Sequence, residues 1–518
     1  MIRIYLVAVL LLIGARLSAA ESVCESIDRI VAAKAKADGV PMSAKADDAE
    51  FLRRVWLDLA GTIPPAEVAR KFLADQSPDK QTKLIEGLLA APTYPTTMAN
   101  RFHIVLMERL GDHASWSQYL QTSFAANKPW NTLVKEILRA DSKSGAAFFL
   151  SKRLENYGQQ AVEYSALTRD VGRLFLGVNL QCAECHDHLT VNDYKQQHFQ
   201  GLHAFFRNLA LGAGPLPTVA EKPTTEKIKF ASVFTLEEAL TGPALPGGKM
   251  IDIPTFPKGQ EFAEPPDRKT NNPGVPKFST LAVASEELPT AKNRAFVRNG
   301  VNRLWFLLLG RGLVHPLDMH HSGNLASHPE LLDLLEREFV AHQFDIKWLF
   351  REILLSETYQ RSSLLPAGAK TPPANAFAVA LEKRLSAEQL FAAITAATGT
   401  KPADAAKAKF LKAFANQPRE PEEDVEVSLK AALFLSHDAT VLEMLQAKPG
   451  NLIERLGKLT DNAAFAEELY LAVLTRKPSA DELATVSKIL TKPNQIRETA
   501  ARKLAWALIA SHEFGVNH

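Results

Sequence analysis

The stretch FLRRVWLDLAGTIPPAEVARKFLAD, residues 51–75, has the pattern of two amphipathic helices separated by a short turn. Apolar residues recur at spacings of three and four on both sides of the segment Gly61 to Pro65. Glycine commonly ends a helix and proline commonly begins the next one. The stretch therefore predicts a helical hairpin. The same periodicity in KQTKLIEGLLA, TTMANRFHIVLMERL and NTLVKEILRA predicts further helices between about residues 25 and 210.

The composition changes between residues 211 and 290. This segment holds twelve of the thirty prolines, which helices cannot accommodate in their interior. The run KIKFASVF within it is typical of a strand. We expect an irregular, proline- and glycine-rich segment with a few short strands, or a small β insertion.

Helical patterns return from residue 291 to 518, and several helix starts are marked by capping boxes. These starts are Ser327 to Glu330, Ser386 to Gln389 and Ser479 to Glu482, and Gly399 is expected to end the second helix. The sequence therefore predicts a mainly α fold, with helical domains at 25–210 and 291–518 joined by the segment 211–290. No internal repeat of fixed period is present.

The first twenty residues predict export. Arg3, an apolar run of ten residues and the small residues before Glu21 form the three parts of a secretory signal peptide, residues 1–20. The apolar run is shorter than the about 20 residues that span a bilayer. We expect a periplasmic or secreted protein with no stable membrane insertion after cleavage.

Charge and cysteine content exclude several classes of protein. Loss of Arg3 and Arg16 with the signal peptide takes the formal net charge from +2 to zero. A neutral chain without a basic block gives no electrostatic reason to bind nucleic acid. Three cysteines are too few for a disulfide scaffold in a chain of 518 residues.

The segment QCAECHDHL, residues 181–189, carries the strongest chemical motif. Cys182, Cys185 and His186 form the C-x-x-C-H pattern of covalent haem attachment, in which two thiolates bind the porphyrin and the histidine binds its iron. The sixth iron ligand is left open among Met250, His198 and His203, and an iron with five ligands is a further alternative. Met107, which lies at helical spacing among apolar residues, is expected in the core.

Zinc is the first alternative to haem. Cys182 and Cys185 have the spacing of half a zinc site, and two of His186, His188, His198 and His203 would complete a Cys₂His₂ set. A disulfide or redox-active dithiol is the second alternative.

Other polar residues receive structural interpretations. Met319-His320-His321 is expected in a polar loop, and His328 at the start of a helix. Asp58, which follows Arg53 and Arg54, predicts a salt-bridged helix face. The sequence contains no glycine-rich phosphate loop, nucleophile elbow or H-E-x-x-H motif.

The chain resembles the planctomycete-type cytochrome-C-like domain family, followed by the companion C-terminal domain of that family. The resemblance rests on FLRRVWLDLAGTIPPAEV, FLGVNLQCAECHDH and GLHAFF in the first half. In the second half it rests on NRAFVRNGVNRLWFLLLGRGLVHPLD, SHPELLDLLEREFVAHQFDIKWLFREILLSETYQRSS, RLSAEQL, LYLAVLTRKPSADEL and LAWALIASHEFGVNH. It implies an exported protein, often encoded near sulfatase-like partners and associated with polysaccharide breakdown, and it assigns no reaction.

Two departures from the family pattern concern neighbours of the motif. Leu189-Thr190-Val191 follows His188 where the family has proline and phenylalanine after the histidine. Asp318-Met319-His320-His321 stands where the family tends to have an acidic pair and a basic residue. The roles of these altered neighbours are therefore in doubt, whereas the motif itself is retained.

Three hypotheses follow. The first is an exported protein with one haem c and an electron-transfer or redox role. The second is a zinc-stabilised helical scaffold that binds an exported, sulfatase-like hydrolase. The third is a hydrolase of sulfated or complex carbohydrate, for which the sequence offers no nucleophile. Whether the chain is an enzyme is left open.

Overall fold

The computed structural model describes residues 21–140, 143–155, 162–212, 217–270, 272–419 and 429–518. Helices dominate these residues, and their named strands pair two by two into antiparallel sheets. The predicted mainly α fold is confirmed. The expected signal peptide, residues 1–20, lies outside the described residues. Within the described ranges, no helix has both the length and the apolar character needed to cross a membrane.

Among the described residues, ten helices precede the hairpins. They are α1 (Val23–Ala37), α2 (Asp48–Ala60), α3 (Ala66–Ala74), α4 (Lys80–Ala90), α5 (Tyr94–Met107), α6 (Ala114–Ala125), α7 (Trp130–Arg139), α8 (Ala147–Leu154), α9 (Tyr164–Val171) and α10 (Gln196–His203). A π-helical turn at Gly172–Leu176 and a 3₁₀ turn at Cys182–Glu184 lie between α9 and α10.

The helical hairpin α2–α3 forms as the sequence predicts. The Asp47 side chain caps α2 by accepting from the backbone N–H groups of Ala49 and Glu50, at 3.0 and 2.9 Å. Gly61 ends α2 with φ +71°, and a Cβ at this position would lie 3.1 Å from a Thr97 methyl group. Both the left-handed backbone and the close neighbour therefore favour glycine here.

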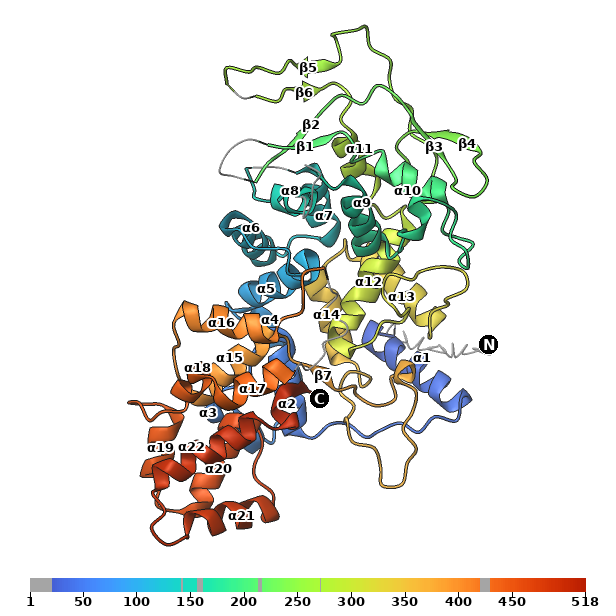
Figure 1. The fold of residues 1–518 in the computed structure, drawn as a ribbon. Helices are drawn as coiled ribbons and strands as arrows, with labels where there is room; N and C mark the ends of the chain where they lie inside the picture. The colour runs from blue at the N-terminus through green and yellow to red at the C-terminus, as the bar shows by residue number, and fades with distance from the viewer. Residues whose placement is uncertain (1–20, 141–142, 156–161, 213–216, 271, 420–428) are drawn as a thin grey trace, which may run out of the picture.

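The proline-rich segment forms three hairpins at one end of the molecule (Figure 1). Their strands are β1 (Leu209–Leu211) with β2 (Val219–Glu221), β3 (Ile228–Ala231) with β4 (Glu238–Thr241), and β5 (Phe262–Glu264) with β6 (Val275–Pro276). Strand β3 lies within the run KIKFASVF, which the sequence analysis interprets as a strand. Two-stranded hairpins have little independent stability, so these depend on the helices beneath them.

The second half of the chain is again helical. Its elements are α11 (Thr280–Glu287), α12 (Arg294–Leu309), α13 (Pro329–Ala341), α14 (Ile346–Leu355), a 3₁₀ turn (Ala374–Ala376), β7 (Lys383–Arg384), α15 (Ala387–Thr398), α16 (Asp404–Phe414), α17 (Leu429–His437), α18 (Ala439–Met444), α19 (Leu452–Lys458), α20 (Asn462–Leu474), α21 (Ala480–Leu490), α22 (Arg497–Ile509), α23 (His512–Gly515) and β8 (Val516–Asn517).

Two of the three predicted capping boxes are present. Ser386 caps α15, which ends at Gly399, and Ser479 caps α21. The third prediction is wrong, because the cap residue of α13 is His328 rather than Ser327, and its side chain makes no capping hydrogen bond. Instead the His328 ring is buried, with its centroid 5.6 Å from that of Phe377. Packing therefore prevails over the local signal at this position.

The helices surround two cores, and α2 contributes to both. The larger core takes buried side chains from α1 to α14, including Phe51 and Val55 of α2. The smaller core lies among α15 to α22 and includes Leu57 of α2 and Ile63 of the following turn. The larger core thus draws on both helical halves of the sequence. The domain limits that the composition predicts, at 25–210, 211–290 and 291–518, therefore stay a prediction.

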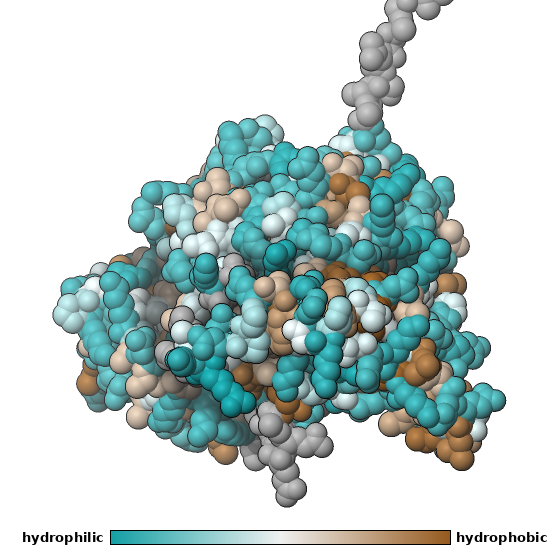
Figure 2. Space-filling view, turned by 90° about the horizontal axis from the view of Figure 1, so that it is seen from above, coloured by the Kyte–Doolittle hydropathy of each residue, from teal (hydrophilic) through white to brown (hydrophobic). Residues whose placement is uncertain are grey.

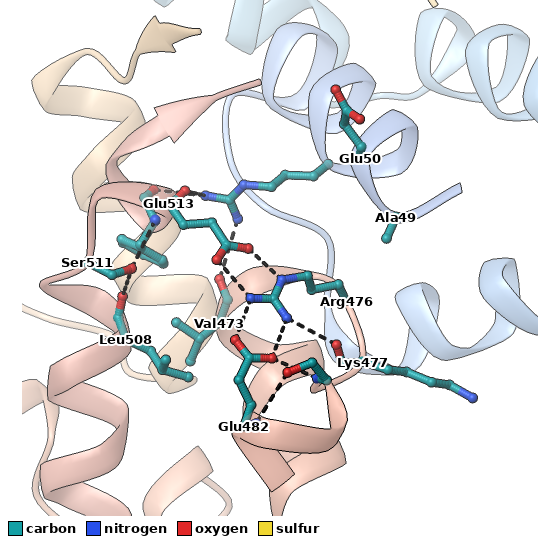
Figure 3. A network of polar contacts seen from close by, with 12 residues as sticks. Ala49, Glu50, Val473, Arg476, Lys477, Glu482, Leu508, Ser511 and Glu513 are labelled. Carbon is teal, nitrogen blue, oxygen red and sulfur yellow. Dashed lines mark hydrogen bonds and ion pairs between the residues drawn. The ribbon is translucent and has the colours of Figure 1, made fainter. Parts of the chain in front are cut away.

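The last strand, β8, pairs with a strand from the middle of the second half of the chain. It pairs with β7 through Lys383↔Asn517 and Arg384↔Val516. Close by, Arg476 lies between Glu482 and Glu513 and donates to both carboxylates, as Figure 3 shows. The hydrogen bonds from Arg476 lower the pKa of Glu482 to about 2. This arginine therefore links the turn after α20 to the starts of α21 and α23.

Candidate functional site

The turn that carries Cys182 and Cys185 is held against two helices by its central residues. The Ala183 side chain is fully buried. The Glu184 carboxylate pairs with Arg169 of α9 at 2.5 Å, and its backbone carbonyl accepts from the Gln200 side chain of α10 at 3.1 Å. These contacts fix the backbone of the turn, so the two flanking cysteines project from a defined position.

Both thiols of the turn are free and exposed to solvent. They lie at the two ends of one short 3₁₀ turn, Cys182 as its first residue and Cys185 as the residue after it. No disulfide joins the two sulfur atoms in this structure, and the disulfide alternative stays a prediction. Because both cysteines are exposed, a planar group bound to both sulfur atoms has access to them.

His186 is half-buried and its ring orientation is fixed by two contacts. Its Nδ1 lies 2.6 Å from the backbone carbonyl oxygen of Asp187. A carbonyl oxygen only accepts, so Nδ1 carries the proton and Nε2 keeps its lone pair. The ring also packs on Phe234, with centroids 4.6 Å apart. The residue is therefore in the tautomer whose Nε2 can bind a metal.

The other predicted histidines make local contacts. The Nδ1 of His188 accepts from the backbone N–H of Val191 at 3.0 Å, and His203 Nδ1 is 3.1 Å from the Thr168 hydroxyl. Burial lowers the pKa of His203 to about 4. His198, on the first turn of α10, has its Nδ1 3.5 Å from the backbone N–H of its cap residue. The His188 bond stabilises its own loop, and the bonds of His198 and His203 lie at the two ends of α10.

The structure does not bring these side chains together as a Cys₂His₂ set. Across the described residues, no group of three or more cysteine, histidine, aspartate or glutamate side chains is placed to hold a metal ion. Met250, the remaining predicted ligand, is 37% exposed and lies between β4 and β5. Met107 is fully buried in the larger core, as expected.

An apolar surface flanks the cysteine turn. It consists of four side chains from the β3–β4 hairpin, each between 58% and 74% exposed: Val233, Phe234, Leu236 and Leu240. The backbone N–H of Val233 donates to the carbonyl oxygen of Cys185 at 3.1 Å, which places the hairpin tip beside the motif. Figure 2, which views the hairpin end of the molecule, shows brown atoms gathered at one edge of a largely teal surface. Sequence reasoning did not predict this surface.

Two families match the chain, in the order that the resemblance implies. Residues 26–210 match PSCyt2, described as a protein of unknown function (DUF1549), and residues 283–413 match PSD1, also described as a protein of unknown function (DUF1553). The chain therefore carries a PSCyt2 domain followed by a PSD1 domain. No curated protein and no solved structure matches it. The cysteine turn lies within the PSCyt2 match.

A second candidate site lies between the PSCyt2 and PSD1 parts of the chain. It is a cleft of about 1490 Å³, lined by residues of α2 and α5 on the PSCyt2 side and of α12, α15 and α16 on the PSD1 side. Asp58 lies at this cleft and is only 1% exposed. Asp58 thus takes part in a salt bridge, as the sequence indicates, but the salt bridge is buried and its cationic partner is Lys383 rather than Arg53 or Arg54.

The Asp58 carboxylate is bound by residues from distant parts of the PSCyt2–PSD1 chain. Lys383 Nζ donates to both of its oxygens, at 2.7 and 2.8 Å. The Tyr359 hydroxyl and the Asn517 amide donate at 2.8 and 3.0 Å, and Arg101 lies 3.8 Å away. We call these five residues the Asp58 cluster. Burial lowers the pKa of Lys383 to about 8, whereas it raises that of Tyr359 well above its usual value.

The loop Met319-His320-His321 is only partly as expected. His321 is partly exposed, and its Nδ1 accepts from the backbone N–H of Gly323 at 3.2 Å. His320 is partly buried, and Asn302 donates to its Nε2 at 3.3 Å. Burial lowers the pKa of His320 to about 3. This histidine is therefore a neutral packing residue rather than part of a solvated loop.

Proposed function

We propose that this PSCyt2–PSD1 protein carries one covalent haem c, with thioether bonds from Cys182 and Cys185 and with His186 as an axial ligand of the iron. Haem iron held in this way exchanges single electrons, which makes electron transfer or redox sensing the associated function. The observation that carries the proposal is the state of the turn. Two free, exposed thiols flank it, and the adjacent imidazole has Nε2 available.

The residues around the turn fit such a group chemically. A porphyrin is a large apolar ring, and the exposed side chains of the β3–β4 hairpin offer apolar surface directly beside the cysteines. Phe234 packs on the His186 ring and restricts its rotation. The carbonyl of Asp187 fixes the tautomer of the same ring, as hydrogen-bond partners of metal-binding histidines commonly do.

Export is part of the proposal, because covalent haem attachment in bacteria takes place outside the cytoplasm. The signal-peptide pattern of residues 1–20 supports a periplasmic or secreted location. The partner is then an exported redox protein or hydrolase, and the association of the family with polysaccharide breakdown favours the hydrolase.

The decisive experiment is expression of the full chain in a host competent for cytochrome maturation. A Soret band that survives acid–acetone extraction is expected, since thioether bonds resist this treatment. The double variant Cys182→Ser/Cys185→Ser should lose the band completely, whereas Cys24→Ser, at the third cysteine, should retain it.

The zinc alternative predicts a different outcome of the same experiment. A colourless protein with one zinc ion per chain would refute the haem proposal and support a zinc-stabilised scaffold. A colourless protein without metal would refute both proposals and leave the exposed thiols as a redox pair.

A further inference from the structure

The cleft between the PSCyt2 and PSD1 parts has mainly apolar walls. Side chains from both parts contribute, namely Ile104, Phe306, Leu307, Leu317, Phe391 and Leu411. Its volume of about 1490 Å³ is larger than the roughly 300–1,000 Å³ of common small-molecule sites. The cleft therefore has room for a ligand with an extended apolar body.

The buried floor of the cleft carries excess positive charge. Lys383 and Arg101 share one carboxylate, that of Asp58, and among the described residues no other carboxylate lies within ion-pair distance of either cation. Arg101 otherwise donates to the backbone carbonyls of Asp58 and Leu307. An unbalanced charge acts over a longer range at a buried site than in water, so it favours an anion in the cleft.

The acidic side chains that line the cleft are already bonded. Glu388 pairs with Arg109, Glu108 with Arg173, and Glu382 with His512. The Asp112 carboxylate accepts from the Ser117 hydroxyl at 2.8 Å. These contacts reduce the repulsion that the acids would exert on an anionic ligand.

In contrast to these acids, three cationic side chains at the mouth of the cleft are not engaged in ion pairs with described residues. Arg384, Lys407 and Lys412 line the cleft and are exposed, and they make no ion pair with any described residue. The Thr62 hydroxyl, which also lines the cleft, is a buried donor without a hydrogen-bond partner in the described part of the chain. Both features suit a ligand with an acidic head group.

We propose that this cleft binds an amphipathic organic anion, a carboxylate with an apolar chain. Its head group contacts the cations at the mouth, and its apolar chain lies along the walls between the two parts. The site is separate from the cysteine turn, and the proposal does not depend on haem. Binding there would link α2 and α5 to α15 and α16 through the ligand.

Three probes with the same ten-carbon chain test the proposal by calorimetric titration of the full-length protein. Decanoate should bind at one site at least tenfold more tightly than decan-1-ol, and decyltrimethylammonium should bind no more tightly than the alcohol. Equal affinity for the three probes, or absence of saturable decanoate binding, would overturn the proposal. Binding at many equivalent sites would overturn it as well, since it indicates a detergent effect.

Two variants locate the binding site. Arg384→Gln/Lys407→Gln should weaken decanoate binding about tenfold and leave decan-1-ol unchanged, because both side chains are exposed and contribute only charge. Ala392→Trp should weaken both probes by filling the cleft. Lys488→Gln/Lys492→Gln, on and just after the distant helix α21, also removes two exposed positive charges and is the matched control. Undiminished decanoate binding in the first two variants would place the ligand elsewhere and refute the assignment.

Discussion

The cysteine turn and the Asp58 cluster are built in opposite ways. Cys182, Cys185 and His186 are neighbours in sequence, remain accessible, and rest on the fold through one buried alanine and the contacts of Glu184. Asp58 is bound by Tyr359, Lys383 and Asn517, which lie more than 300 residues away in sequence, and it is buried. A short motif can thus be attached to a fold, whereas a buried charge cluster requires the whole fold.

The largest expected effect is at the Asp58 cluster. Asp58→Asn leaves Lys383 and Arg101 without their shared carboxylate and should lower the free energy of unfolding by about 3–5 kcal/mol, the cost of breaking a buried ion pair. Urea denaturation measures the loss. Asp252→Asn, at an exposed carboxylate, is the control and should have no effect. A loss below about 1 kcal/mol is typical of an exposed ion pair. Such a result would contradict the contrast between the buried Asp58 cluster and the exposed cysteine turn.

The second effect concerns pH. The pKa of His203 is lowered to about 4 and that of His320 to about 3 by burial, from an ordinary value of 6.5. The unfolded chain therefore binds protons that the folded chain does not, so this contribution to stability is complete above pH 6.5 and declines as the pH falls toward 4.

Denaturation midpoints between pH 7 and 4 measure this decline. His203→Gln should reduce the slope, whereas His437→Gln, at an exposed histidine, should leave it unchanged. An identical slope in the wild type and His203→Gln would show that His203 takes up its proton in the folded protein at ordinary pH.

A helix cap beside the cleft should give a smaller effect. Ser386 accepts from the backbone N–H of Gln389 at 3.2 Å and begins α15, which forms one wall of the cleft. Ser386→Ala should cost about 1 kcal/mol of unfolding free energy. The control Ser487→Ala, within α21, should not destabilise. If Ser386→Ala were neutral, the tertiary contacts of α15 would suffice without the cap.

The smallest effect on stability is expected at the cysteine turn. Cys182→Ser in the haem-free protein should change the free energy of unfolding by less than about 0.5 kcal/mol, because the thiol is exposed and unpaired. Thermal denaturation at fixed pH measures it. A cost similar to that of Asp58→Asn would mean that the thiol is part of the packed structure, and the contrast between the two regions would fail.

The difference between the two regions also explains what the sequence could predict. Local signals were sufficient for the helices, for the Ser386 and Ser479 caps and for the hairpin at Gly61. The sequence was also sufficient to identify the Cys182–His186 motif, because the motif is defined by the spacing of its cysteines and histidine alone. The haem itself stays a prediction.

Features that depend on tertiary contacts were not predicted. The partners of Asp58 come from segments that no local pattern connects, and a lone aspartate between Val55 and Leu59 was the only available signal. The sequence placed His320 in a polar loop and His328 at the start of a helix, but it gave no sign that packing buries His328 or that His320 contacts Asn302. A buried histidine and an exposed one have the same local sequence pattern.

The pairing of β8 with β7 has a consequence for the order in which the protein folds. Asn517 donates to the Asp58 carboxylate, and the carbonyl of His518 accepts from Arg54 Nε at 2.9 Å. During synthesis α2 is made hundreds of residues before these two partners. Arg54 and Asp58 of α2 can therefore complete these two hydrogen bonds only after residues 517 and 518 have been made and have packed against α2.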